Sequence, residues 1–170
     1  MQDCLDIIYK EIDKLYHEAR SVYEKWMAIV AERELQRTRM ELNRREKTNY
    51  ELRLEFSENS FRCRWFKVEF HRHHTTKRLN KLYSAISEPE SGNYGKGKFR
   101  SANEWELELI MYAEVEFSPI RNKVKHLMKA HQSILHAAKA GNIKVEVKPQ
   151  VTRVEKTELT ISSIKKRMTS

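Results

Sequence analysis

The side chains most capable of chemistry form a short run near the middle of the chain. The run His71-Arg72-His73-His74 places His71 and His73 on one face if it is a strand, because strand side chains alternate between faces. Two imidazoles in that arrangement could coordinate a metal ion, but no carboxylate or thiol ligand lies beside them in the sequence. The neighbouring arginines and lysines would also repel a cation. We therefore expect no metal site here and favour a positively charged loop, to which the histidines add charge as the pH falls.

The same histidines leave one catalytic alternative open. With Tyr83 as the nucleophile, they are similar to the two-histidine motif of endonucleases that nick single strands, although the intervening residue is normally apolar and is Arg72 here. The chain has no phosphate-binding Walker loop, no glycine-rich dinucleotide-binding motif and no nucleophile elbow that would present a catalytic serine. Four glutamates could in principle pair as acid and base, but we expect them on a solvated helix surface: Glu106, Glu108, Glu114 and Glu116. The prediction is thus no enzyme, no catalytic residue and no cofactor.

The basic residues give a more definite signal, because they concentrate in one part of the chain. Residues 44–100 contain 14 Lys and Arg against 7 Asp and Glu, whereas residues 101–140 contain five of each. A basic middle between charge-balanced helical segments is typical of a module that binds a polyanion, and we expect nucleic acid. The predicted phosphate and base contacts are Arg62, Arg64, Lys77, Arg78, Lys81, Lys96, Lys98 and Arg100.

Aromatic residues lie among these basic residues. Trp65, Phe66 and Phe70 could stack on exposed bases or fill the core, and the sequence leaves both readings open. A two-stranded ribbon carrying Arg62 and Arg64 could enter a major groove and contact bases. Basic and aromatic side chains do not distinguish DNA from RNA, so RNA remains an alternative.

Two segments on either side of this module have the apolar spacing of long helices. Apolar residues recur with alternating gaps of three and four from Leu5 to Ile29, and the pattern returns from Ile110 to Ala138, where it includes His131 as a core or interface histidine. A Ser101–Glu104 capping box opens the second helix, and Pro119 predicts a kink or a restart. Tyrosines beside the first stripe widen it enough for a bundle with a second chain, so we expect a homodimer.

Between the helices the apolar period falls to two. Tyr50 to Phe56 alternate with charged residues, and the alternation resumes after a turn candidate at residues 57–60, which predicts a β-hairpin. The apolar side switches at Trp65–Phe66, so either a bulge intervenes or both faces are covered. A third strand within residues 79–86 is weakly marked, and the glycine-rich residues 87–100 are predicted to form an exposed loop.

These patterns predict an α+β fold, with two long antiparallel helices, a central basic β-hairpin module and a basic C-terminal extension. The expected single domain, residues 1–141, comprises a helix over 3–47, the hairpin and loops over 48–100, and a helix over 101–140. Residues 142–170 are expected to be a strand-like or flexible basic tail. The chain has two cysteines, too few for a disulfide framework, and no apolar run long enough to span a membrane. It also shows no N-terminal signal-peptide pattern of basic residues followed by apolar ones, so we expect a cytoplasmic protein.

The order of these elements resembles the MobI-type mobilisation proteins of conjugative plasmids and integrative conjugative elements. The resemblance covers roughly residues 5–140 and rests on Ser60-Phe61-Arg62-Cys63-Arg64-Trp65, Tyr94-Gly95-Lys96-Gly97-Lys98, Glu104-Trp105-Glu106-Leu107-Glu108-Leu109 and Glu116-Phe117-Ser118-Pro119-Ile120-Arg121. It implies an auxiliary factor that binds double-stranded DNA at the origin of transfer and helps to assemble the relaxase there, with catalysis left to the relaxase. The alternative is a helical protein–protein adaptor whose charge only aids solubility.

Overall fold

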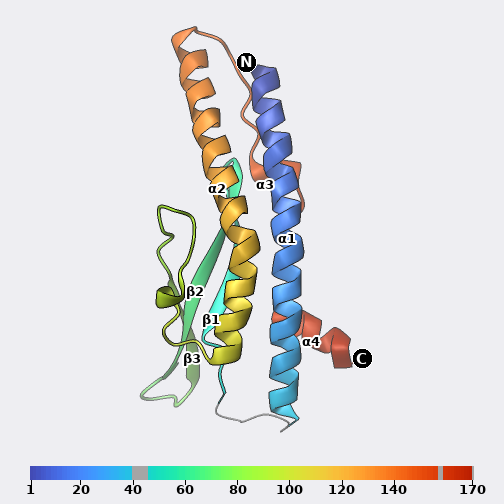
Figure 1. The fold of residues 1–170 in the computed structure, drawn as a ribbon, viewed down its shortest axis with the longest axis vertical. Coiled ribbons are helices and arrows are strands. Elements are labelled where there is room, and N and C mark those ends of the chain that lie inside the picture. Colours follow the sequence, from blue (N-terminus) through green and yellow to red (C-terminus); the bar gives the residue numbers. More distant parts are fainter. Residues whose placement is uncertain (40–45, 157–158, 170) are drawn as a thin grey trace.

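The structure is a computed structural model that describes residues 1–39, 46–156 and 159–169. Its elements are α1 (Gln2–Thr38), β1 (Tyr50–Ser57), β2 (Ser60–Arg72), β3 (Leu79–Ala85), the short 3-10 helix η1 (Lys96–Lys98), α2 (Glu104–Ala140), α3 (Gln150–Arg153) and α4 (Ile161–Thr169). Figure 1 shows α1 and α2 side by side, running in opposite directions, with the three-stranded sheet against one end of the pair. The α+β class and the two long antiparallel helices are therefore confirmed.

The apolar stripes of the two helices meet each other and the sheet. In α1 the predicted stripe is buried from Leu5 to Trp26 except for the half-buried Val22, but Ile29 is 44% exposed and the buried positions move to Val30 and Ala31. A straight helix has 3.6 residues per turn, so a 3.5-residue pattern drifts around its surface over several turns. In α2 the predicted stripe is buried except for the half-buried Leu127 and Ile134, and the helix continues through Pro119, which is exposed.

The hairpin forms as predicted, with a tighter turn. Ser57 pairs with Ser60 across the two residues Glu58 and Asn59, and the pairing continues without a bulge to Tyr50 and Lys67. Because the register is unbroken, Trp65 faces the helices while Phe66 lies on the opposite face. The guanidinium of Arg53 covers the Phe66 ring, 4.4 Å from its centre, so both faces of the sheet are covered at this end.

The segment at residues 87–100 differs from the exposed loop that we predicted. Tyr94 and Phe99 are fully buried, and Phe99 packs edge-on against Tyr50 and Trp65 at 5.1 and 5.6 Å between ring centres. Glycines and lysines between these two rings gave the segment a loop-like composition. The buried rings fix its path, and Lys96, Lys98 and Arg100 remain exposed between and beside them.

The C-terminal tail also differs from the prediction, because its described residues contain no strand and pack along α1. Residues 143–149 are extended without strand pairing, and α3 and α4 follow. Arg153 binds Asp13 of α1 and the main-chain carbonyl of Asn59 at 3.0–3.1 Å. Ile164 of α4 is buried in the main core. The alternation of Ile143, Val145 and Val147 that suggested a strand does not correspond to a buried side, because Ile143 and Val147 are 48% and 42% exposed. The contacts of this stretch with α1 come instead from the Glu146 amide, which donates to Gln2, and from Lys148, which binds Asp6.

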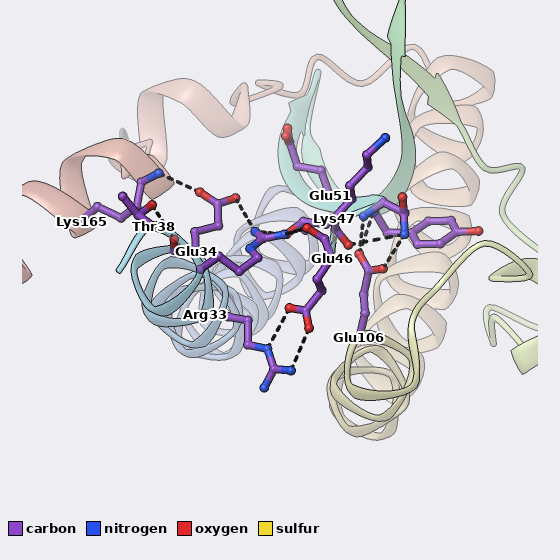
Figure 2. A network of polar contacts seen from close by, with 12 residues as sticks. Arg33, Glu34, Thr38, Glu46, Lys47, Glu51, Glu106 and Lys165 are labelled. Atoms are coloured by element: carbon purple, nitrogen blue, oxygen red, sulfur yellow. Dashed lines mark hydrogen bonds and ion pairs between the residues drawn. The ribbon is translucent and has the colours of Figure 1, made fainter. Parts of the chain in front are cut away.

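Helix α1 is shorter than the predicted helix over 3–47. It ends at Thr38, residues 40–45 lie outside the described part of the chain, and residues 46–49 lead into β1 in a non-helical conformation. Figure 2 shows how polar contacts organise this end of the molecule. Arg33 donates to both carboxylate oxygens of Glu46 at 2.9 and 3.0 Å, and Lys165 of α4 donates to Glu34 at 2.7 Å.

The broad stripe on α1, from which we expected a second chain, is covered within the same chain. The Tyr9 hydroxyl hydrogen-bonds His131 of α2 at 2.9 Å, and the Tyr16 hydroxyl donates to the carbonyl of Glu155 at 3.3 Å. His131 is thus a buried core histidine, as predicted, and burial followed by the charge of Arg153 lowers its pKa. The width of this stripe is accounted for without a dimer.

Candidate nucleic-acid interface

The most basic exposed feature is the two-stranded ribbon formed by the far ends of β2 and β3, defined here as residues 70–82. Strand β3 pairs with β2 from Phe66–Ala85 to Arg72–Leu79, and β1 does not reach beyond Lys67. Beyond that point, the sheet is only two strands wide. Every residue from 70 to 83 is exposed, and residues 71–81 contain four Lys or Arg and three His but no Asp or Glu.

The tip of the ribbon is held by backbone geometry and by one histidine. The amide of His73 donates to the carbonyl of Arg78 at 2.8 Å, and Lys77 has a left-handed backbone with φ of 54°. The Nδ1 atom of His73 accepts from the amides of Thr75 and Thr76 at 3.3 Å. His73 therefore shapes the turn, and that turn presents Lys77 and Arg78 to solvent.

The ribbon has a distinct face that continues the open face of the sheet. The register places Phe70, Arg72, Leu79 and Lys81 on this face, together with Tyr83. Phe70 is 42% exposed, so it is the only one of the three predicted aromatic residues that is free to stack on a base; Trp65 and Phe66 are buried. Lys81 is partly neutralised by Glu51, 3.3 Å away.

Arg62 and Arg64 lie at the opposite end of the sheet from the ribbon tip. Ten residues of β2 separate Arg62 from Arg72, which is about 33 Å in an extended strand. Arg64 forms an ion pair with Glu55 and lies over the Phe66 ring at 5.5 Å. The structure thus does not gather the eight predicted residues into one patch, and it separates these two arginines from the lysine-rich elements.

The loop cations Lys96, Lys98 and Arg100 lie on the segment between β3 and α2, and its end lies near the base of the ribbon. The Ser101 amide donates to the Tyr50 hydroxyl at 3.1 Å, and its carbonyl accepts from the Asn49 side chain at 2.8 Å. Asn49 is also the backbone partner of Val68, at the point where β1 ends beside β2. Arg100, next to Ser101, therefore lies near the ribbon base.

A buried polar cluster fixes the other end of this segment, and sequence reasoning missed it. Glu114 accepts from the Trp65 indole N–H at 2.7 Å and from the Tyr94 amide at 3.2 Å, and it forms a buried ion pair with Arg121. Arg121 in turn donates to the Gly92 carbonyl at 2.8 Å. The sequence predicts a solvated Glu114. The available signal for burial was Arg121, an opposite charge about two helical turns further along the same face, beside the apolar stripe.

Glu106 is the second buried carboxylate that we had placed in solvent. Its Oε1 accepts from the amides of Asn49 and Tyr50 at 2.7 and 2.8 Å, as Figure 2 shows, so it positions the start of β1. Burial raises the pKa of Glu106 to about 7, and the hydrogen bonds from these amides act in the opposite direction. Glu108 and Glu116, by contrast, are exposed as predicted.

The catalytic alternative finds no support in this geometry. The register puts His71 on the helix side of the ribbon and Tyr83 on the open side, whereas a nucleophile and its metal-binding histidines must face one substrate. The Tyr83 ring is covered by Arg53, 4.2 Å from its centre. Within the described ranges, no three His, Cys, Asp or Glu side chains are grouped to hold a metal ion, and no helix is long and apolar enough to cross a membrane.

Comparison with protein families gives a match over most of the chain. The model of the family described as MobI protein matches residues 15–135, which include most of α1, the whole sheet and most of α2. No curated protein and no solved structure matches the chain. The match spans the scaffold, the ribbon and the anchored loop together.

Proposed function

The chain belongs to the MobI family, whose function is related to mobilisation, and on that premise we propose that it is a DNA-binding auxiliary factor of conjugative transfer. It recognises the origin of transfer and helps the relaxase to assemble there, in the cytoplasm. The ribbon at residues 70–82 makes the principal contact with double-stranded DNA. The loop cations Lys96, Lys98 and Arg100 add phosphate contacts near its base.

The observation that carries this proposal is the uncompensated charge of the ribbon. Arg72, Lys77 and Arg78 have no ion pair within the described part of the chain, while Arg53 and Arg64 on the sheet each bind a glutamate. An exposed cation without a carboxylate partner is available for a phosphate, and neutralising phosphates releases condensed counterions. The ribbon is therefore a better candidate than the sheet arginines.

The shape of the ribbon also suits a duplex. A two-stranded antiparallel ribbon fits the major groove of B-DNA, which is about 12 Å wide, and its outward side chains can reach base edges there. Arg72 lies on the open face, where its guanidinium is free for a bidentate contact with guanine. Lys77 and Arg78, at the tip, are placed for phosphates.

The test is binding to a labelled duplex that carries the origin of transfer of its own element. The triple variant Arg72→Gln, Lys77→Gln and Arg78→Gln should weaken binding by at least about a hundredfold at moderate salt, because it removes three phosphate or base contacts. The matched control is Lys10→Gln, Lys25→Gln and Lys139→Gln, which removes the same charge from exposed helix positions. Equal loss in both variants, or none in either, would contradict the proposal.

The proposed partners follow from the same function and are tested separately. Within it, the relaxase binds the protein–DNA complex rather than the ribbon itself. Because the α1 stripe is covered within one chain, the proposal of a homodimer rests only on the symmetry that a repeated or palindromic site would require. A protein–protein adaptor would keep its partner binding in the ribbon triple variant and would bind neither duplex. Comparing double-stranded DNA with RNA of the same sequence separates the DNA and RNA readings.

A further inference from the structure

A second basic feature lies away from the ribbon, in an open pocket of about 540 Å³. It is bounded by β2 near the hairpin turn, by α2 and by the segment that follows β3. Four cationic residues line it against the single carboxylate of Glu88: Arg62, Arg121, Lys125 and Lys129. Ser57, Ser60 and Gln132 add polar groups to its wall.

The deepest cation of the pocket has an unused donor. Arg121 is 5% exposed, and its Nη2 and Nε atoms bind Glu114 and the Gly92 carbonyl. Its Nη1 atom is buried and has no hydrogen-bond partner in the part of the chain that the structure describes. A buried guanidinium nitrogen without a partner is unfavourable, so an anion that reached it would satisfy it.

The strand on the other side of the pocket also has unused donors. Strand β3 pairs with β2 only from Phe66 onward, so residues 60–64 pair with β1 alone and leave a free edge. The carbonyl of Trp65 points to this edge, because it accepts from the Ile86 amide at 2.9 Å. In an antiparallel pair, alternate residues point the same way, so the amides of Phe61 and Cys63 face the pocket edge as well.

We infer that this pocket binds a nucleoside phosphate unit, either as one nucleotide of a DNA strand or as a free mononucleotide. The phosphate would contact Arg62, Lys125 and Lys129, with the buried guanidinium of Arg121 in the wall behind them. The apolar part of the wall, formed by Phe61, Val124 and Met128, suits a sugar or base. The volume exceeds that needed for a lone phosphate ion, and Lys125 keeps two donors after its 2.6 Å bond to the Glu90 carbonyl.

This inference does not depend on duplex binding by the ribbon. The experiment is a titration of the ¹⁵N-labelled full chain with thymidine monophosphate, with a short oligothymidine and with a glutamate-rich peptide. The expected result is saturable shifts of the Phe61, Cys63, Lys125 and Lys129 amides with at least one of the two nucleotide probes. Shifts with both probes identify a site open to free nucleotides, and shifts with the oligonucleotide alone identify a DNA-strand site. The inference would be overturned if neither nucleotide probe shifted these amides. It would also be overturned if the glutamate-rich peptide shifted them as much as the nucleotide probes do.

The matched variants sit on one helix. Lys125→Ala with Lys129→Ala removes two exposed lining cations and should weaken binding of the responding probe by at least about tenfold. Lys123→Ala with Lys139→Ala removes the same charge from exposed positions of α2 that do not line the pocket, and it should leave the affinity unchanged. Equal weakening in the two double variants would overturn the inference. The ribbon triple variant should retain the pocket shifts, which separates failure of this site from failure of the proposed function.

Discussion

At the scale of single residues, two buried carboxylates determine how the basic elements are presented. Glu114 joins β2, the segment after β3 and Arg121 of α2, and Glu106 holds the start of β1. Both were predicted to be solvated, because glutamate on a helix is usually exposed. Composition alone cannot show that a neighbouring strand supplies an indole or amide donor to such a residue.

Removing the Glu114 carboxylate should be strongly destabilising. Glu114→Ala leaves the Arg121 cation buried without its counter-charge and the Trp65 indole N–H without its acceptor. We expect the free energy of unfolding to fall by about 3–5 kcal/mol in chemical denaturation. Glu116→Ala, an exposed change on the same helix, should stay within about 0.5 kcal/mol of the parent. Similar effects of the two substitutions would contradict a structural role for the Glu114 cluster.

Glu106 should make stability depend on pH. Its pKa rises from 4.5 to about 7 in the folded chain, so between these values the folded state holds a proton that the unfolded state has released. The free energy of unfolding should therefore fall as the pH rises through this window, by up to about 1.4 kcal/mol per pH unit, and level off above it. Glu106→Gln should remove this slope and Glu108→Gln should keep it. A difference between the parent and Glu106→Gln that stays constant from pH 4.5 to 7 would refute the assignment.

At the scale of elements, the sequence predicted the helices and the hairpin well and the connecting segments poorly. Long apolar stripes such as Leu5–Trp26 report burial on one helix face, and alternation from Tyr50 to Phe56 reports a half-buried strand. Strand β3 was weakly marked because all seven of its residues are exposed, so burial imposes no alternation on it. The segment after β3 and the tail were mispredicted, because isolated anchors, Tyr94 and Arg153, fix them rather than a periodic pattern.

The tail gives a prediction at this scale. Asp13 accepts hydrogen bonds from Gln150 and Arg153 at 3.1 Å, so Asp13→Ala should release the segment around α3 from α1. We expect a loss of about 1–3 kcal/mol in the free energy of unfolding, and faster tryptic cleavage between Arg153 and Val154. Glu11→Ala, an exposed change two residues away, should alter neither. Unchanged cleavage of the Asp13 variant would show that other contacts hold the tail.

At the scale of the whole molecule, a helical scaffold presents cations at two separate places. The charge asymmetry of residues 44–100 predicted the basic module, but not its division between a projecting ribbon and a pocket about 33 Å of strand away. Sequence order alone placed Arg62 and Arg72 in one basic run, whereas an extended strand carries them to opposite ends. The electrostatic field of the basic module would steer a polyanion toward either the ribbon or the pocket. The local geometry of each then determines which of them binds it.

The most direct measurement of DNA binding through the ribbon is the salt dependence of affinity for a duplex carrying the origin of transfer, with a scrambled duplex beside it. Each phosphate contact contributes about −0.9 to the slope of log affinity against log salt, so the Arg72, Lys77 and Arg78 triple variant should have a slope shallower by about 2 to 3. The parent should also prefer the transfer-origin duplex by about a thousandfold or more. An unchanged slope in the triple variant, or no binding of the parent to either duplex at low salt, would contradict DNA binding through the ribbon.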